Sequence, residues 1–78
     1  MADAAQITEV DARGLDCPMP LLKAKRALNA MSAGQQLRVL ATDSGSQRDF
    51  RVFAEQSGNR LLDVAENAGV YSYLIEKR

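Results

Sequence analysis

Histidine is absent from the sequence, and cysteine occurs once, at Cys17. A single cysteine excludes a disulfide within the chain. Without histidine, the chain also lacks the Cys-His and Ser-His pairs of nucleophilic enzymes and the usual ligand sets of zinc and haem. We therefore expect no metal and no cofactor. A free thiol persists in a reducing compartment, so the expected location is the cytoplasm.

Aromatic residues and excess charge are also scarce. The chain has two Phe, two Tyr and no Trp, and its ten basic residues are balanced by ten acidic ones. Nucleic-acid-binding domains usually carry a basic excess and aromatic residues on which bases stack. No apolar run has the length of a membrane span, and residues 1–6 do not resemble a secretory signal. We therefore expect neither nucleic acid nor a membrane as a direct partner.

The length of 78 residues corresponds to one domain with a small core, residues 1–78, of which residues 1–5 are expected to be flexible. Alternating and helical hydrophobic patterns predict strand, helix, strand, helix, strand and strand in that order. The elements expected are strand 6–12, helix 18–31, strand 37–42, a helix between residues 46 and 58, strand 61–65, a turn at 67–69 and strand 70–75. The fold class predicted is an α/β two-layer sandwich with two helices on one face of a four-stranded sheet. The pattern does not determine the strand order.

Local signals place the ends of the two predicted helices. Gly34 fits a left-handed stop after the first helix, and Gly58 fits the same role after the second. Ser46 and Asp49 have the spacing of a capping box at the start of the second helix, although Asp replaces the usual Glu or Gln. The loop at residues 43–46 is accordingly interpreted as a turn followed by a cap.

The candidate site lies between the first strand and the first helix, where Gly14-Leu15-Asp16-Cys17-Pro18-Met19-Pro20 occurs. Loops at this edge of an α/β sheet often carry active groups. The free N–H groups and the dipole at a helix N-terminus stabilise an anionic sulfur, so we hypothesise that the pKa of Cys17 is lowered. Pro18 and Pro20 suit a first helical turn, and Met19 retains its N–H group.

Asp16 complicates this hypothesis. If Asp16 caps the helix, its carboxylate competes for the same donors and raises the pKa of the thiol. If Cys17 is the cap instead, Asp16 points away and matters less. A third interpretation is that Cys17 is a small buried hydrophobic residue without a chemical role, which is common for lone cysteines. The sequence alone does not decide among these alternatives.

Basic residues lie off the apolar stripe of the first helix, at Lys23, Lys25 and Arg26. Such residues commonly form a solvated face. Because they follow Cys17 closely, we also hypothesise that they help to dock acidic partner proteins.

Taken together, the residues resemble the TusA/SirA-like sulfur carriers, whose core motif is Cys-Pro-x-Pro after a strand. The resemblance rests on residues 10–20, Leu21-Leu22-Lys23-Ala24-Lys25, Gly34, Ala41-Thr42-Asp43, Asp49-Phe50, Phe53 and residues 71–77. It implies a mixed four-stranded sheet under two helices and a persulfide on Cys17. Asp16, Pro18, Met19 and Pro20 would support that residue. Some members carry a second cysteine near the second helix, where this chain has Ala54.

The resemblance also implies a function and partners. Sulfane sulfur would arrive from a cysteine desulfurase or another sulfur donor protein and leave for an acceptor protein. The relay would lead toward tRNA thiolation, cofactor synthesis or sulfur metabolism, and we expect a monomer. Whether such a carrier is an enzyme is partly a matter of definition, because it holds sulfur stoichiometrically. The alternatives are a thiol-based redox regulator and a protein-binding module without sulfur transfer.

Overall fold

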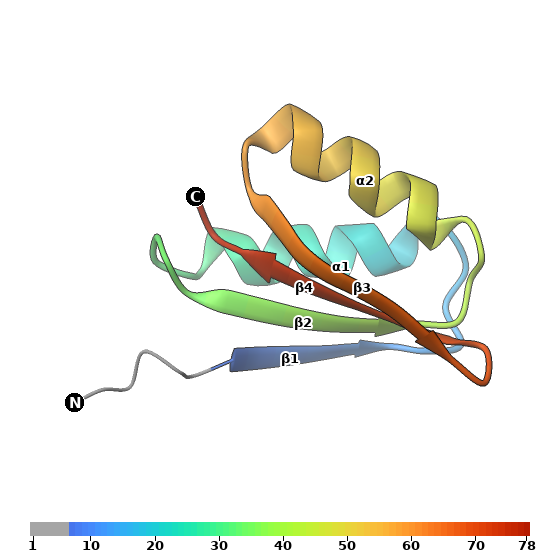
Figure 1. Ribbon diagram of the computed structural model, residues 1–78. Coiled ribbons are helices and arrows are strands. Elements are labelled where there is room, and N and C mark those ends of the chain that lie inside the picture. Colours follow the sequence, from blue (N-terminus) through green and yellow to red (C-terminus); the bar gives the residue numbers. More distant parts are fainter. Residues whose placement is uncertain (1–6) are drawn as a thin grey trace.

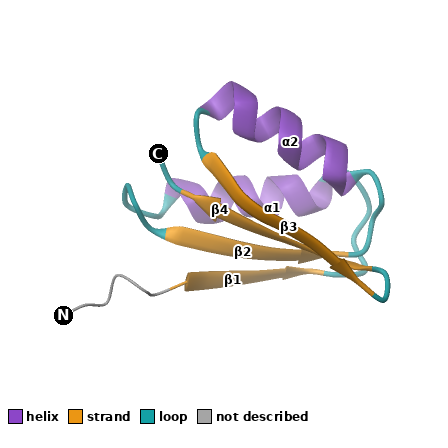
Figure 2. Ribbon diagram, in the orientation of Figure 1, coloured by secondary structure: helices purple, strands orange, loops and turns teal. Residues whose placement is uncertain are grey.

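The computed structural model describes residues 7–78, so the expectation of a flexible segment over residues 1–5 lies outside the described residues. The element order within this range matches the one predicted from the sequence (Figures 1 and 2). The elements are β1 (Ile7–Ala12), α1 (Met19–Asn29), β2 (Gln36–Ala41), α2 (Ser46–Ser57), β3 (Arg60–Asn67) and β4 (Val70–Glu76).

The strands form one mixed sheet in the order β1-β2-β4-β3. β1 and β2 are parallel, whereas β4 is antiparallel to both of its neighbours. Both helices cover the same face of the sheet (Figure 1). Helix α1 packs on β1 and β2, and α2 packs on β3 and β4. The predicted two-layer sandwich is therefore confirmed.

The core lies between the sheet and the helices, and the strand alternation accounts for it. Leu37, Val39 and Ala41 are fully buried, and their antiparallel partners on β4 are Ile75, Tyr73 and Tyr71. The helices contribute Ala24, Leu28 and Phe50 to the same core. The ring of Phe50 stacks on that of Tyr73 with centroids 4.5 Å apart. Each fully buried large side chain contributes about 1.5–3 kcal/mol to folding.

The ends of the helices agree with the sequence in one case and differ in the other. Gly58 adopts φ 81° and ends α2 with its N–H bonded to the carbonyl oxygen of Ala54, as predicted. Helix α1 instead ends at Asn29, with Ala30 in a right-handed conformation. Gly34 has φ 89° but lies in the turn into β2, where its N–H donates to the carbonyl oxygen of Lys77 at 2.8 Å. The prediction for Gly34 is wrong because the left-handed residue is needed where the chain enters the strand.

The capping box predicted at the start of α2 is also wrong. Gly45 is the N-cap, and no side chain makes a capping hydrogen bond there. Ser46 is buried, and its hydroxyl lies 2.6 Å from the hydroxyl of Tyr73. Asp49 accepts a hydrogen bond from Cys17. Both side chains of the predicted box therefore bond to other elements, so neither is available to the helix end.

The turn between β3 and β4 forms as predicted. Ala68 and Gly69 have φ 53° and 84° and connect Asn67 to Val70. Two successive residues with positive φ are characteristic of the type I′ turn, whose twist matches that of the flanking strands.

Candidate functional site

The site forms at one edge of the sheet, where the parallel strands β1 and β2 both end. Because these strands are neighbours with the same direction, the loops that follow them lie side by side. The N–H of Gly14 in the first loop donates to the hydroxyl oxygen of Thr42 in the second at 2.9 Å. Figure 1 shows the first turns of α1 and α2 at this same edge. Residues distant in sequence are thus brought together around Cys17.

Cys17 is exposed in the turn that precedes α1, and its peptide bond to Pro18 is cis. Pro18 occupies the N-cap position, and no side chain caps the helix. The contribution of Asp16 is through its backbone, since its carbonyl oxygen accepts a hydrogen bond from the N–H of Met19 at 2.8 Å. Neither of the capping roles considered for Asp16 and Cys17 is therefore present. The exposure of Cys17 also rules out the buried structural role.

The sulfur of Cys17 faces a carboxylate instead of the helix N–H groups. Its thiol donates a hydrogen bond to Oδ2 of Asp49, in the first turn of α2, at a sulfur–oxygen distance of 2.7 Å. This bond raises the pKa of the thiol, and partial desolvation and the charges of Asp49 and Asp43 raise it further. The pKa lowering expected from the helix N-terminus is therefore wrong. A carboxylate in direct contact outweighs the partial charge of the helix end.

Asp43 supplies a second carboxylate to the site. Its Oδ2 atom is buried and accepts no hydrogen bond from the described part of the chain. Gly45 allows this close arrangement, because a Cβ atom there would lie 3.0 Å from that oxygen and 3.9 Å from the Cβ atom of Cys17. The interpretation of residues 43–46 as a turn and a cap missed the role of Asp43, and the predicted capping box missed that of Asp49. The available signal was their position after the strand next to β1.

The residues predicted to support Cys17 have different environments. Pro20 is buried under the first turn of α1, which anchors the helix start to the core. Pro18 and Asp16 are exposed. Met19 is also exposed, at 46%, and Leu22 at 48% lies one turn further along the helix. The surface next to the thiol is therefore partly apolar.

The three basic residues predicted for docking do not form one patch. Lys25 faces α2, with its Nζ atom 5.6 Å from the ring centroid of Phe53. Lys23 and Arg26 line a separate hollow with Leu15, Met19 and Leu22. The basic residues are thus divided between two sides of α1.

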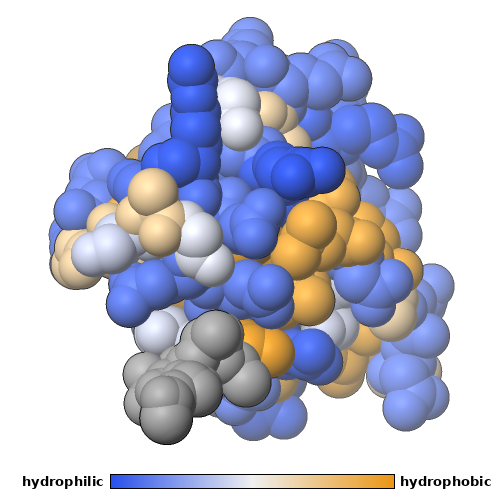
Figure 3. All heavy atoms as spheres, turned by 60° about the vertical axis from the view of Figure 1, so that its left-hand side comes forward, coloured by the Kyte–Doolittle hydropathy of each residue, from blue (hydrophilic) through white to orange (hydrophobic). Residues whose placement is uncertain are grey.

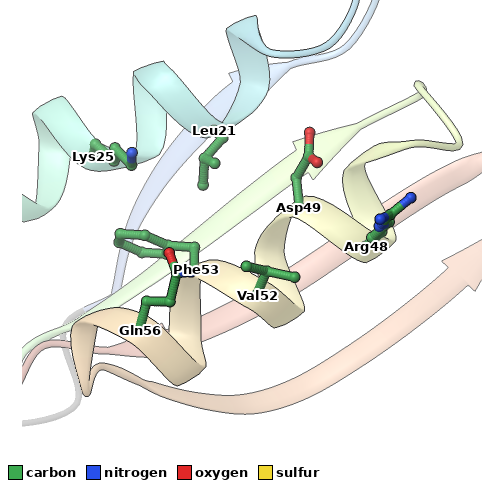
Figure 4. A pocket seen from close by; sticks show the side chains of 7 residues that line it. All are labelled: Leu21, Lys25, Arg48, Asp49, Val52, Phe53 and Gln56. Carbon is green, nitrogen blue, oxygen red and sulfur yellow. The ribbon is translucent and has the colours of Figure 1, made fainter.

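A groove of about 360 Å³ runs between the two helices. Figure 4 shows Leu21 and Lys25 of α1 facing residues of α2 across it, and Asp49 pointing toward the first turn of α1. The lining residues are Leu21, Lys25, Arg48, Asp49, Val52, Phe53 and Gln56. Asp49 therefore connects the groove to the sulfur of Cys17.

The face of the molecule seen in Figure 3 is mostly hydrophilic. On the face shown in Figure 3, hydrophobic residues gather in one area and hydrophilic ones cover most of the rest.

Residues 7–78 contain no cluster of three or more acidic, cysteine or histidine side chains suited to a metal ion. In the same range, no helix is both long enough and apolar enough to cross a membrane.

The fold and the site define a small α/β domain that presents a single exposed thiol at a strand–loop–helix junction. A profile of the family described as "Sulfurtransferase TusA" matches residues 8–77. The chain belongs to this family.

Individual relatives agree with this assignment. The chain is 54% identical to the sulfur carrier protein TusA of Allochromatium vinosum, over 99% of both chains. It is 45% identical to a putative sulfur carrier protein of Neisseria meningitidis, covering 88% of this chain and 93% of the relative. The crystal structure of a SirA-like protein from Desulfitobacterium hafniense has a TM-score of 0.78 at 30% identity, covering 91% of this chain and 96% of the other.

Proposed function

We propose that this protein is a sulfur carrier that holds sulfane sulfur as a persulfide on Cys17 and passes it to an acceptor protein. The observation that carries the proposal is that a member of the TusA family exposes its only cysteine at the edge where both helices begin. Relatives named as sulfur carriers match almost the whole chain. They do not favour the alternative functions, a redox regulator or a binding module.

The transfer chemistry needs only the one thiol. Cys17 loses its proton, and its sulfur attacks the outer sulfur of the donor persulfide. The S–S bond of the donor breaks, the donor leaves as a thiolate that takes up the proton, and the outer sulfur remains on Cys17 as a persulfide. In the second step an acceptor thiolate attacks that outer sulfur, and Cys17 leaves in turn. Each step exchanges one S–S bond for another, so no external oxidant or reductant is consumed.

The surroundings of Cys17 support docking of protein partners. Exposed Met19 and Leu22 offer apolar contacts beside the thiol, and Lys23 and Arg26 line the adjacent hollow. We propose that a sulfur donor such as a cysteine desulfurase docks there through an acidic, partly apolar surface. The acceptor is proposed to be a second protein with a reactive thiol, acting in the cytoplasm.

A relay experiment tests the function. Radiolabelled sulfur is loaded on the purified protein by a cysteine desulfurase and cysteine, and the loaded protein is separated and mixed with an acceptor thiol protein. We expect label to leave the carrier and appear on the acceptor, and Cys17→Ser to transfer none. Label that reaches the acceptor equally well through Cys17→Ser would refute the role of this residue.

A further inference from the structure

Asp49 is directed at the sulfur of Cys17, although it belongs to a different helix. It lies in the first turn of α2, where an acidic residue commonly stabilises the helix end. Its carboxylate makes no capping hydrogen bond and instead lies 2.7 Å from the sulfur. The contact is a bond from a neutral thiol to an anionic acceptor. It is therefore specific to the protonated, unloaded form of Cys17.

Loading with sulfur removes the basis of this contact. A persulfide is more acidic than a thiol, so the loaded residue is readily anionic and then has no proton to donate to Asp49. Two negative groups would face each other at short range, at an exposed but partly desolvated site. The carboxylate thus stabilises the empty carrier and destabilises the anionic loaded one.

A second carboxylate near Cys17 adds to this preference for the empty carrier. The buried and unbonded Oδ2 atom of Asp43 lies beside Gly45, which also approaches Cys17. Both carboxylates act to raise the pKa of the Cys17 thiol. The other ionisable groups near the pair are Asp16 next to Cys17, the buried hydroxyl of Tyr73, and Lys25 and Arg48 in the groove lined by Asp49.

We propose that Asp49 is a positioning residue that sets how tightly the carrier holds its cargo, favouring the empty thiol over the anionic persulfide so that Cys17 releases sulfur readily. The proposal rests on the carrier function proposed above. At the pH of the test, the equilibrium it affects is Cys17–SH plus donor–S–S⁻ giving Cys17–S–S⁻ plus donor–SH. One S–S bond breaks and one forms, and each side carries the same number of protons. Asp49 acts on the position of this equilibrium and is not consumed.

The test measures the equilibrium and not only the rate. Wild type, Asp49→Asn and Asp49→Ala are each equilibrated with a mixture of glutathione persulfide and glutathione, and the loaded fraction is read from the intact mass. Glu55→Gln is the matched control, because Glu55 is exposed on the same helix away from the sulfur. Circular dichroism confirms that each variant is folded, and either Asp49 variant suffices if the other does not fold.

At about pH 8 we expect both Asp49 variants to raise the equilibrium constant for loading about three- to tenfold, with Glu55→Gln unchanged. The ratio to wild type should fall as the pH is lowered, because protonation of the persulfide removes its repulsion by Asp49. Equal or lower loading of the folded Asp49 variants would overturn the inference while leaving the carrier function intact. Wild type that gains no sulfur from the persulfide mixture or from a desulfurase would instead refute the carrier function itself.

Discussion

At the sulfur of Cys17, two electrostatic influences oppose each other. The first turn of α1 follows directly, and a helix N-terminus favours an anion. The carboxylate of Asp49, in hydrogen-bond contact at 2.7 Å, favours the neutral thiol, and its effect is the larger one. The resting protein therefore holds Cys17 as a neutral thiol, which is less prone to oxidation than a thiolate.

The pH dependence of alkylation follows from this contact. The raised pKa means that the thiolate forms only at a higher pH than in an unfolded chain. We expect the rate of alkylation by iodoacetamide to rise with a midpoint above that of the protein unfolded in urea. In folded Asp49→Asn the midpoint should move down toward the unfolded value, while Glu55→Gln should leave it unchanged. A wild-type midpoint at or below the unfolded value would contradict the assignment.

Residues near in sequence were easier to predict at this site than residues that folding brings together. The choice of Cys17 as the candidate thiol and the position of Pro20 in the first helical turn follow from a local motif. Asp49 lies 32 residues further along the chain, so its contact with Cys17 depends on how α2 packs. The sequence offered a plausible local role for Asp49 in a capping box, and the tertiary contact replaced it. For the same reason the direction of the pKa shift could not be predicted.

At the scale of elements, α2 has two roles that compete for its first turn. Its apolar side provides Phe50 to the core, and Ser46 bonds the buried hydroxyl of Tyr73. Asp49 in the same turn faces Cys17. With these side chains committed elsewhere, the helix begins at Ser46, and its N-cap residue, Gly45, provides no side-chain cap. Such a cap typically contributes about 1 kcal/mol, which this helix forgoes.

Turn chemistry explains which element boundaries were predictable. Gly58 and the turn at residues 67–69 were predicted because each needs positive φ, which glycine adopts without strain. Gly34 has the same property but serves the entry to β2. A glycine therefore marks a turn reliably, whereas the end of the preceding helix depends on packing that no single residue reveals.

The hairpin between β3 and β4 offers a stability prediction. Ala68 holds φ 53°, a conformation that costs an alanine more than an asparagine. We expect Ala68→Asn to raise the free energy of unfolding by about 0.5–1 kcal/mol, measured by urea denaturation. The control is Ala33→Asn, an exposed turn position without positive φ, where the change should stay within about 0.5 kcal/mol. Destabilisation by Ala68→Asn would contradict the turn assignment.

At the scale of the whole molecule, the strand order determines the site. β1 and β2 must be parallel neighbours for the loops carrying Cys17 and Asp43 to meet at one edge. The hydrophobic pattern predicted every strand, including β3, which is exposed except at the half-buried Leu61. It contained no information on which strands pair, since the position of β4 between β2 and β3 depends on contacts between residues distant in sequence.

The charge distribution predicts how transfer responds to salt. Raising the ionic strength from about 0.01 M to about 0.1 M shortens the screening length from about 30 to about 10 Å. If Lys23 and Arg26 steer an acidic surface toward Cys17, as proposed, the rate of loading by a protein donor should fall several-fold over this range. Lys23→Ala and Arg26→Ala should weaken the salt dependence, whereas Arg60→Ala on β3 should not. A loading rate that does not change with salt would remove the docking role.

The central claim is that Cys17 carries the sulfur, and the intact mass of the protein tests it most directly. Wild type and Cys17→Ala are incubated with a cysteine desulfurase and cysteine, and each mass is measured before and after treatment with reductant. We predict that wild type gains one sulfur, that reductant removes it, and that Cys17→Ala gains none. No gain on folded wild type with an accessible thiol, or an equal gain on Cys17→Ala, would contradict the account.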